Sequence, residues 1–367
     1  MISLVIIITV STYIIFKISR SFDFAASFLT QNLNEGIKGP TVNAIASSLP
    51  ELLISFFFLF YIGEVQGFSA GFATIIGSSI FNVAIIPTIS FLYIYYKQGK
   101  LSFPTDRDII LQDGLFLILT IIVLLIGLYF GGISIALSSC LIVLYTIYIF
   151  WIINSRSKVT ESSIEKKRAL QSTIKKKQIF NSTQRSLAVK IINLDLISLL
   201  NVRKNNTIFK AIILILISII LISFSCKLLV ESSQELAEYF NINLFFITFF
   251  IIAIASSIPD TILSVKDAKN ENYKDSFSNA YASNIFDICI GIGLPVLIYL
   301  LINDINEIPI PTYSNNIIIF TSAILLLIFT IIITFIYWIK DINIYRTILI
   351  IGMYIIFLGS VYYISIF

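Results

Sequence analysis

Long apolar segments separated by short polar connections dominate the pattern of hydrophobic and polar positions along the chain. A helix needs about 20 apolar residues to cross a hydrocarbon core of about 30 Å. Ten segments meet this length, at residues 1–20, 40–62, 70–96, 109–130, 132–153, 208–230, 243–265, 276–302, 314–339 and 344–366. The first lacks a basic start and a small-residue cleavage site, so we expect a retained helix and not a signal peptide. The pattern predicts an all-α integral membrane protein with ten transmembrane helices.

The composition agrees with a membrane protein and restricts its chemistry. Of the 367 residues, 57% are hydrophobic and 13% are charged, against about 25% charged in soluble domains. Histidine is absent, which excludes a histidine-ligated metal and a histidine proton relay. Cys140, Cys226 and Cys289 lie in separate apolar segments, which indicates buried thiols and not a disulfide framework or metal cage. Oxygen ligands remain, and hard cations such as Na⁺, K⁺, Ca²⁺ and Mg²⁺ prefer them.

Basic residues concentrate in one loop, because residues 154–207 carry twelve of the 25 lysines and arginines. By the positive-inside rule this loop is predicted to be cytoplasmic, with both chain termini outside. Lys17, Arg20 and Lys227 are expected near helix ends, where long side chains reach the interface. The loop is read either as a contact for anionic lipid or, more simply, as a solvated linker with a surface-lying stretch near Ser186–Leu200. The Ile/Asn/Lys-rich composition favours a microbial plasma membrane.

Two pairs of hexapeptides match between the halves of the chain. Residues 46–51 (ASSLPE) align without a gap to residues 255–260 (ASSIPD), and residues 77–82 (GSSIFN) align to residues 282–287 (ASNIFD). Each half contains five crossings, an odd number, so the halves insert with opposite orientation, as in alternating-access transporters. The sequence therefore predicts two inverted-topology five-helix repeats, 1–153 and 208–367, joined by the basic loop 154–207.

Three acids, Glu51, Asp260 and Asp287, lie well inside apolar segments. An acidic residue at the centre of a membrane helix costs about 2.5–3.5 kcal/mol on insertion scales, and no lysine or arginine lies at comparable depth. These acids are therefore either protonated or paired with a cation. A carboxyl group held neutral and hydrogen-bonded between helices is the structural alternative.

Hydroxyl and amide groups accompany these acids at helical spacing. Residues three and four apart share a helix face, which groups Ser47 and Ser48 with Glu51, Ser256 and Ser257 with Asp260, Ser78 with Asn82, and Ser283 with Asp287. Pro50 and Pro259 directly precede two of the acids, and each removes a backbone donor. The carbonyls near Val42–Ala46 and Ile251–Ala255 are thereby predicted to be available to ions, as in broken helices that line a cavity.

These motifs resemble the two alpha-repeats of the calcium/cation antiporter superfamily, the sodium/calcium exchangers, over nearly all of the chain except the basic loop. The resemblance implies that Glu51 and Asp260 are the central acids that bind Ca²⁺ or Na⁺ alternately. It further implies ligand roles for Ser47, Ser48, Ser78, Asn82, Ser256, Ser257, Ser283 and Asp287, and for the backbone carbonyl of Ala253. Ala-Ser-Ser replaces the family's Gly-Thr-Ser in both repeats. Asp260 together with Asp287 resembles the potassium-dependent exchangers more than the simple ones.

We therefore expect a secondary-active antiporter that exchanges Ca²⁺ for Na⁺ by alternating access, with K⁺ dependence left open. The first and sixth helices have the family-implied role of a sliding gate. The lipid bilayer and the transported ions are the expected partners, with no cofactor, no enzymatic activity and no nucleic acid. A Ca²⁺/H⁺ or Mg²⁺ exchanger is an alternative within transport. Outside transport, an intramembrane aspartyl hydrolase using Asp260 and Asp287 and a non-transporting sensor or scaffold stay open.

Overall fold

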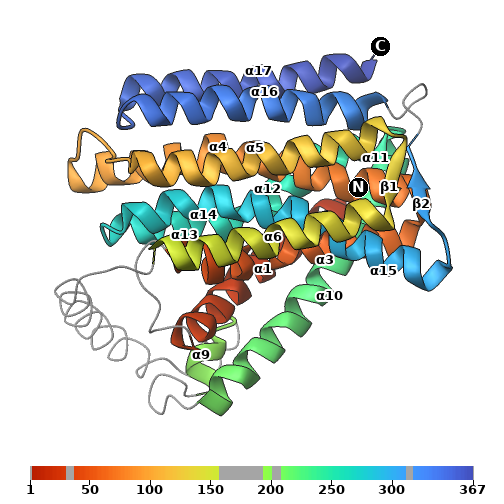
Figure 1. Cartoon of the computed structure of the whole chain (residues 1–367). Helices are drawn as coiled ribbons and strands as arrows, with labels where there is room; N and C mark the ends of the chain where they lie inside the picture. Colours follow the sequence, from red (N-terminus) through yellow and green to blue (C-terminus); the bar gives the residue numbers. More distant parts are fainter. Residues whose placement is uncertain (1, 30–36, 157–192, 201–207, 311–316, 367) are drawn as a thin grey trace.

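The computed structural model describes residues 2–29, 37–156, 193–200, 208–310 and 317–366, and its regular structure is almost entirely helical (Figure 1). The long helices are α1 (Ile2–Leu29), α4 (Glu64–Gln98), α5 (Arg107–Tyr129), α6 (Ile135–Arg156), α10 (Ile208–Phe240), α16 (Ile317–Ile339) and α17 (Ile344–Ile366). The remaining crossings are shorter helices joined end to end: η1 (Gly39–Asn43), α2 (Ala44–Ser47) and α3 (Leu49–Ile62); α11 (Leu244–Ile247), η2 (Thr248–Ile252), α12 (Ala253–Ser256) and α13 (Ile258–Lys269); and α14 (Tyr273–Phe286), η3 (Asp287–Ile292) and α15 (Gly293–Asn303).

The number of crossings follows from the length of these apolar helices. Within the described ranges, nine helices are long and apolar enough to span a membrane, or ten if the bent pair Pro40–Ser47 and Leu49–Ile62 is one span. The predicted all-α membrane fold is thereby confirmed. Of the basic loop, the structure describes the short helix α9 (Leu196–Leu199). The lysine runs and residues 186–192 of the predicted surface-lying stretch fall outside the described residues, and the repeat boundaries stay a prediction.

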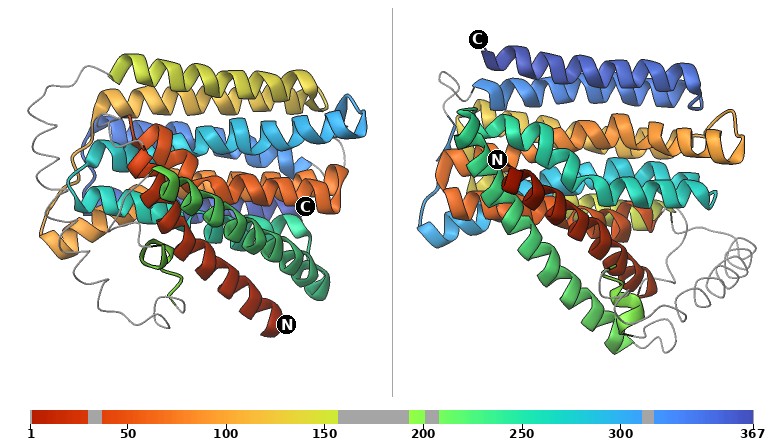
Figure 2. Two further views of the ribbon diagram at one scale, coloured as in Figure 1. Left: turned by 90° about the horizontal axis from the view of Figure 1, so that it is seen from below. Right: turned by 180° about the vertical axis from the view of Figure 1, so that it is seen from behind.

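Helices α1 and α10 pack along each other and stand at an angle to the rest of the bundle (Figures 1 and 2). Helices α16 and α17 lie on the opposite side of the bundle (Figure 1). The broken crossings lie between these two pairs, next to α4, and they carry the predicted ligands. Helices α1 and α10 are the first and sixth crossings, which are expected to act as the sliding gate. They therefore flank one side of the candidate site.

The two ends of the bundle differ in charge and in structure. At one end Lys100 Nζ lies 2.8 Å from Glu271 Oε1, and Lys274 Nζ lies 2.7 Å from Asp106 Oδ2. We call this the basic end; it holds the connections 99–106, 270–272 and 340–343. At the other end, the strand end, β1 (Gly132–Ser134) pairs antiparallel with β2 (Glu307–Pro309).

The two crossings that carry Pro50 and Pro259 break at equivalent positions. Ser48 separates α2 from α3, with a bend of 46° between the flanking helices, and Ser257 separates α12 from α13. Pro50 and Pro259 follow at the start of the new helices, where a missing N–H group costs little. Each proline also leaves the carbonyl four residues earlier without its helical donor. The breaks place Glu51 and Asp260 in the first turns of α3 and α13.

Gly77 lets α4 approach these broken helices closely. A Cβ atom at this position would lie 2.5 Å from the carbonyl oxygen of Phe249 and 2.7 Å from Cβ of Ala253. Both distances are too short for real contacts, so a side chain here would push α4 away from η2 and α12. The residue that directly precedes Ser78 therefore has to be glycine for this packing.

Two expectations about helix ends are wrong. Helix α1 continues to Leu29 and α10 to Phe240, so Lys17, Arg20 and Lys227 lie within helices. The polar stretch after Arg20 stays helical because Asp23 is only 5% exposed and its Oδ2 lies 2.6 Å from Lys266 Nζ. The side chain of Lys17 instead lies over the ring of Tyr13, 5.2 Å from its centre.

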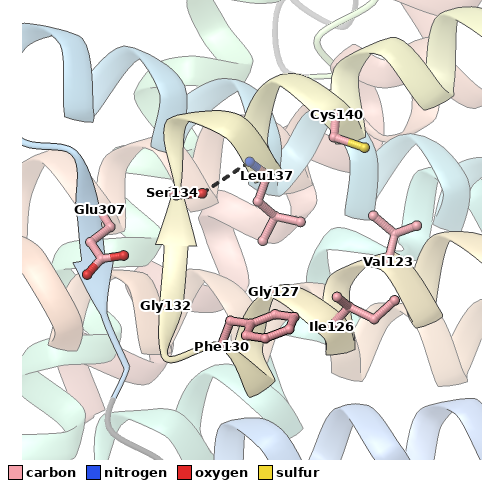
Figure 3. A pocket seen from close by; sticks show the side chains of 9 residues that line it. All are labelled: Val123, Ile126, Gly127, Phe130, Gly132, Ser134, Leu137, Cys140 and Glu307. Carbon is pink, nitrogen blue, oxygen red and sulfur yellow. Dashed lines mark hydrogen bonds between the residues drawn. The ribbon is translucent and has the colours of Figure 1, made fainter.

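The three cysteines are free thiols, but only Cys226 and Cys289 are buried. The expectation of a buried thiol is wrong for Cys140, which is exposed on α6 because it faces outward there. It lines an apolar cavity of about 310 Å³ at the strand end, between α5, α6 and β1 (Figure 3). None of the predicted ion ligands lines this cavity.

Candidate cation site

The three intramembrane acids come together in one cluster. One carboxylate oxygen from each of Glu51, Asp260 and Asp287 lies within 4.8 Å of the other two, and all three side chains are 0% exposed. Glu51 belongs to the first repeat, whereas Asp260 and Asp287 belong to the second. The break before α3 and the break before α13 place two of these acids at helix N-termini, where the helix dipole stabilises negative charge.

Asp260 is the best hydrogen-bonded of the three acids. Ser283 Oγ donates to Asp260 Oδ1 at 2.7 Å, and Asn82 Nδ2 donates to Asp260 Oδ2 at 3.1 Å. Donors from both repeats therefore hold one carboxylate, because Asn82 lies on α4 and Ser283 on α14.

Glu51 and Asp287 have few partners among the described residues. Ser78 Oγ lies 3.4 Å from Glu51 Oε1 and 2.8 Å from Ser257 Oγ. Glu51 Oε2 and both carboxylate oxygens of Asp287 make no hydrogen bond of regular geometry with the described part of the chain, although Ser256 lies near Glu51 and Ser48 near Asp287. A buried carboxylate without donors is costly, so these atoms point to an additional positively charged or protonic partner.

The cluster also lacks a cationic side chain. None of the ion pairs that the described residues form includes Glu51, Asp260 or Asp287. Three carboxylates this close cannot all stay charged in a dry environment without compensation. The arrangement is therefore suited to hold hard cations through oxygen ligands.

The serines beside the acids divide into two groups. Ser47 Oγ donates to the carbonyl of Asn43 at 2.7 Å, and both Ser256 Oγ and Ser257 Oγ donate to the carbonyl of Ala253, at 3.1 and 2.8 Å. Ser48 Oγ is buried, makes no hydrogen bond of regular geometry in the described part and lies near Asp287. The structure thus places these serines at the helix breaks beside Glu51 and Asp260, but the Ala253 carbonyl already accepts hydrogen bonds from its own helix.

Two amides at the site were missed from the sequence. Asn284 Oδ1 accepts from Asn82 Nδ2 at 3.0 Å, and Asn279 Nδ2 lies 3.5 Å from the carbonyl oxygen of Asp260. Asn284 stands inside the quoted ASNIFD motif, and Asn279 lies one helical turn before Ser283. A buried amide inside a membrane helix was the signal that could have identified both.

A third group was also missed, one helix away from the acid cluster. Asp113 on α5 is fully buried, and its Oδ1 lies 2.8 Å from Nη2 of Arg156 on α6. Tyr148 Oη donates to the same carboxylate at 3.1 Å, and Ser278 Oγ also donates to it. Asp113 has its own cationic partner, so it differs in kind from the three clustered acids.

The sequence profile of the family described as "Sodium/calcium exchanger protein" matches residues 3–154 and 210–363 of this chain. The chain belongs to this family. It is an integral membrane protein of a family of exchangers, which are transporters and not enzymes. The resemblance on which the sequence analysis relied is thereby confirmed, and the hydrolase and scaffold alternatives gain no support.

Relatives of the family differ in how much of the chain they match. The "Sodium/potassium/calcium exchanger 2" of Gallus gallus is 34% identical over 145 residues, which are 38% of this chain and 21% of that protein. This chain therefore matches only about a fifth of the length of that exchanger. Inner membrane protein YrbG of Escherichia coli is 23% identical over 277 residues, which are 75% of this chain and 74% of that one.

Solved exchanger structures share the fold at low identity. A structure described as the H⁺/Ca²⁺ exchanger CAX has a TM-score of 0.68 at 15% identity, covering 99% of this chain and 86% of that one. The sodium-calcium exchanger NCX_Mj has a TM-score of 0.60 at 21% identity, covering 98% of this chain and 99% of that one. At such identities the comparison shows the fold alone.

Proposed function

We propose that this chain exchanges Ca²⁺ for Na⁺ across the membrane through the site formed by Glu51, Asp260 and Asp287. The observation that carries the proposal is the position of one oxygen of each acid within 4.8 Å of the other two, with all three side chains fully buried and without an ion pair to a lysine or arginine of the described residues. Both ions bind oxygen ligands and compete for the same carboxylates. Competition for one charge-compensated site makes the transport an exchange.

The formal charge of the acid cluster bears on whether K⁺ is transported together with Ca²⁺. Three ionised carboxylates carry a formal charge of −3, so one Ca²⁺ leaves −1 and Ca²⁺ together with one monovalent cation leaves zero. A neutral complex crosses the low-dielectric barrier at the lowest cost. We therefore favour transport of Ca²⁺ together with K⁺, and the 34% identity to a sodium/potassium/calcium exchanger supports this choice.

The remaining ligands complete the oxygen shell. Ser48, Ser78, Asn82 and Ser283 supply oxygens next to the acids, and Asn82 Oδ1 and Ser48 Oγ make no hydrogen bond of regular geometry in the described residues. Ser47, Ser256, Ser257 and the Ala253 carbonyl lie at the helix breaks and join the shell when the helices move. Loss of one internal hydrogen bond, such as that from Ser257 to Ala253, frees an oxygen for an ion.

Alternating access needs a moving element, and α1 with α10 is our choice for it. These helices contact each other along their length and stand at an angle to the rest of the bundle (Figures 1 and 2). In this proposal the basic end faces the cytoplasm of a plasma-membrane protein, in line with the positive-inside rule. A lipid contact of the loop 154–207 stays a prediction, because its basic runs lie outside the described residues.

The test is ⁴⁵Ca²⁺ uptake into Na⁺-loaded proteoliposomes under an outward Na⁺ gradient, with and without K⁺. We expect gradient-driven uptake that Glu51→Gln abolishes. Glu271→Gln is the matched control, because Glu271 is exposed at the basic end and does not belong to the cluster of Glu51, Asp260 and Asp287. A requirement for K⁺ in the medium supports the neutral-complex argument.

The alternative to this proposal is an exchanger that couples Ca²⁺ transport to protons in place of Na⁺. The unpartnered oxygens of Glu51 and Asp287 can accept protons as well as cations. Uptake driven by a pH gradient, and unaffected by Na⁺, would overturn the sodium coupling while leaving the site in place. Uptake that Glu51→Gln leaves intact would overturn the site itself.

A further inference from the structure

A second group of buried polar side chains lies between the acid cluster and the basic end. Asp267 and Asp275 belong to the hairpin of α13 and α14, and Asn43 is the last residue of η1. Their exposed fractions are 9%, 2% and 2%. Asn43 Nδ2 donates to Asp267 Oδ2 at 3.0 Å, so residues far apart in the sequence meet here. Asp275 lies on α14 one turn before Asn279, whose amide bonds to Ser264 one turn before Asp267, so the hairpin brings the two acids into the same region.

Two unpartnered amide oxygens, one at this place and one nearer the acid cluster, point to a ligand along this helix interface. Asn43 Oδ1 is buried and accepts no hydrogen bond from the described residues, although its amide nitrogen is held at Asp267. Asn279 Oδ1, in α14 between Asp275 and Ser283, is buried and unpartnered as well. A buried acceptor without a donor costs about 1–3 kcal/mol. A cation next to Asp267 would satisfy such an acceptor.

Polar groups connect this place to the central acids. Asn279 Nδ2 reaches the Asp260 carbonyl at 3.5 Å and donates to Ser264 Oγ at 3.1 Å. Ser276 Oγ donates to the carbonyl of Ser264 at 2.7 Å. Ser264 stands one turn after Asp260 and one turn before Asp267 on α13, so oxygens line the helix interface from the acid cluster toward the basic end.

The equivalent positions of the other repeat are apolar. Counted from the aligned motifs, Asp267 corresponds to Phe58, Asp275 to Ala70 and Asn43 to Ile252. Phe58, Ala70 and Ile252 are all buried and belong to one hydrophobic cluster. An apolar cluster therefore occupies the position toward the strand end, whereas acids and an amide occupy the position toward the basic end. Packing alone does not require the polar group, because its counterpart packs without one.

The charges around Asp267 leave it available to a cation. Its neighbour Lys266 is engaged by Asp23, with Nζ 2.6 Å from Oδ2. No lysine or arginine among the described residues forms an ion pair with Asp267. Lys38 is the other cation in its surroundings, and it is not among the ion pairs of the described residues.

We propose that Asp267, Asp275 and Asn43 form a second cation site, which Ca²⁺ occupies between the central acids and the solution at the basic end. This inference rests on the proposed function for the identity of the ion. Two carboxylates and an amide oxygen form a weaker site than the central one, with a Kd on the order of 10⁻⁴–10⁻³ M, as in other sites of low ligand charge. Such a site concentrates Ca²⁺ at one entrance of the exchanger.

The first test measures binding without transport. In the purified full-length variant Glu51→Gln/Asp260→Asn/Asp287→Asn, free Mn²⁺ is followed by electron paramagnetic resonance, and Ca²⁺ is added as competitor. We expect one weak Mn²⁺ site that Ca²⁺ displaces, and Asp267→Asn in this background lowers its affinity by about tenfold or more. Glu271→Gln in the same background leaves the affinity unchanged. Asp275→Asn is the second variant, used in case Asp267→Asn does not fold.

The second test measures the sidedness of transport. In proteoliposomes with one orientation, Asp267→Asn raises the KM for Ca²⁺ presented at the basic end and leaves the KM at the strand end unchanged. The site would be overturned if neither Asp267→Asn nor Asp275→Asn changes the affinity for Mn²⁺. It would also be overturned if Na⁺, but not Ca²⁺, displaces the bound Mn²⁺. Failure of Ca²⁺/Na⁺ exchange in the parent protein would instead overturn the proposed function, while the binding test still decides on the site.

Discussion

Asn82 of the first repeat donates a hydrogen bond to Asn284 of the second, with Nδ2 and Oδ1 3.0 Å apart. The same amide nitrogen lies 3.1 Å from Asp260 Oδ2, and Asn284 Nδ2 donates to the carbonyl of Ser79 at 2.7 Å. The amide pair thus connects α4 and α14 directly beside a central acid. The two repeats meet at this point through fixed donors and acceptors, which orients the carboxylate of Asp260.

Replacing Asn284 by alanine removes the acceptor of Asn82 and the donor to Ser79. Because buried groups then lose their partners, we expect a loss of about 1–3 kcal/mol in unfolding free energy, together with reduced Ca²⁺ uptake. Chemical unfolding in detergent and proteoliposome flux measure the two effects. Asn303→Ala is the control, since Asn303 is exposed and bonds only to the preceding turn. Equal effects of both substitutions would contradict the role of the amide pair.

Gly77→Ala tests the close approach of α4 to the broken helices. The added Cβ would lie 2.5 Å from the Phe249 carbonyl oxygen, so the helices must move apart. Overpacking of this kind costs about 1–3 kcal/mol, and transport falls because Ser78 moves with Gly77. Gly352→Ala is the matched control, because nothing lies within 4 Å of a Cβ there. The measurement is the thermal unfolding midpoint with uptake assayed in parallel.

The buried ion pair of Asp113 and Arg156 predicts a strongly non-additive pair of substitutions. Arg156→Met leaves the Asp113 carboxylate buried without its cation, and we expect a loss of about 3–5 kcal/mol in stability. The double variant with Asp113→Leu recovers much of this loss, because no buried charge remains. Unfolding free energies of both single variants and the double variant form the cycle. Additive effects would show that the two side chains do not interact.

The exposed pair of Lys100 and Glu271 is the comparison for that cycle. Its side chains are 35% and 67% exposed, whereas those of Arg156 and Asp113 are 8% and 0% exposed. Exposed pairs contribute about 0–1 kcal/mol. Lys100→Met is therefore expected to change stability far less than Arg156→Met.

The sequence was sufficient to predict the crossings and the central acids. Apolar length alone indicates a crossing, and a carboxylate inside an apolar segment needs a partner wherever the helices pack, which is why Glu51, Asp260 and Asp287 were identified. The exposure of Cys140 could not be predicted, because it depends on which face of α6 packs inward. The extension of α1 past Arg20 could not be predicted either, because it depends on Asp23 meeting Lys266, a contact between distant segments.

The amide pair shows a different limit of sequence patterns. Asn82 was identified through its match to Asp287, whereas Asn284 stands opposite Ser79 in the repeat alignment and was not. The alignment compares equivalent positions, but the inverted repeats bring non-equivalent positions into contact. Only the packed structure shows that Asn82 meets Asn284.

Asp106, the N-cap residue of α5 at the basic end, predicts how the stability of the protein depends on pH. Burial opposes ionisation, but the hydrogen bond from Lys274 and the N–H groups of Ile109 and Asp108 outweigh it and hold the pKa of Asp106 below its ordinary value. Since the folded pKa lies below the unfolded one, the stabilisation is complete above about pH 4, the usual range of an aspartate. It is lost as the pH falls through the folded pKa.

The variant Asp106→Ala removes this N-terminal cap of α5. We expect a loss of about 0.5–2 kcal/mol at pH 7 and a smaller loss at pH 3, because protonation has already weakened the cap in the wild type. Thermal unfolding in detergent at both pH values measures the difference. Glu235→Ala, which changes an exposed acid of α10, should alter stability little at either pH. A loss from Asp106→Ala that grows as the pH falls would contradict the direction of the pKa shift.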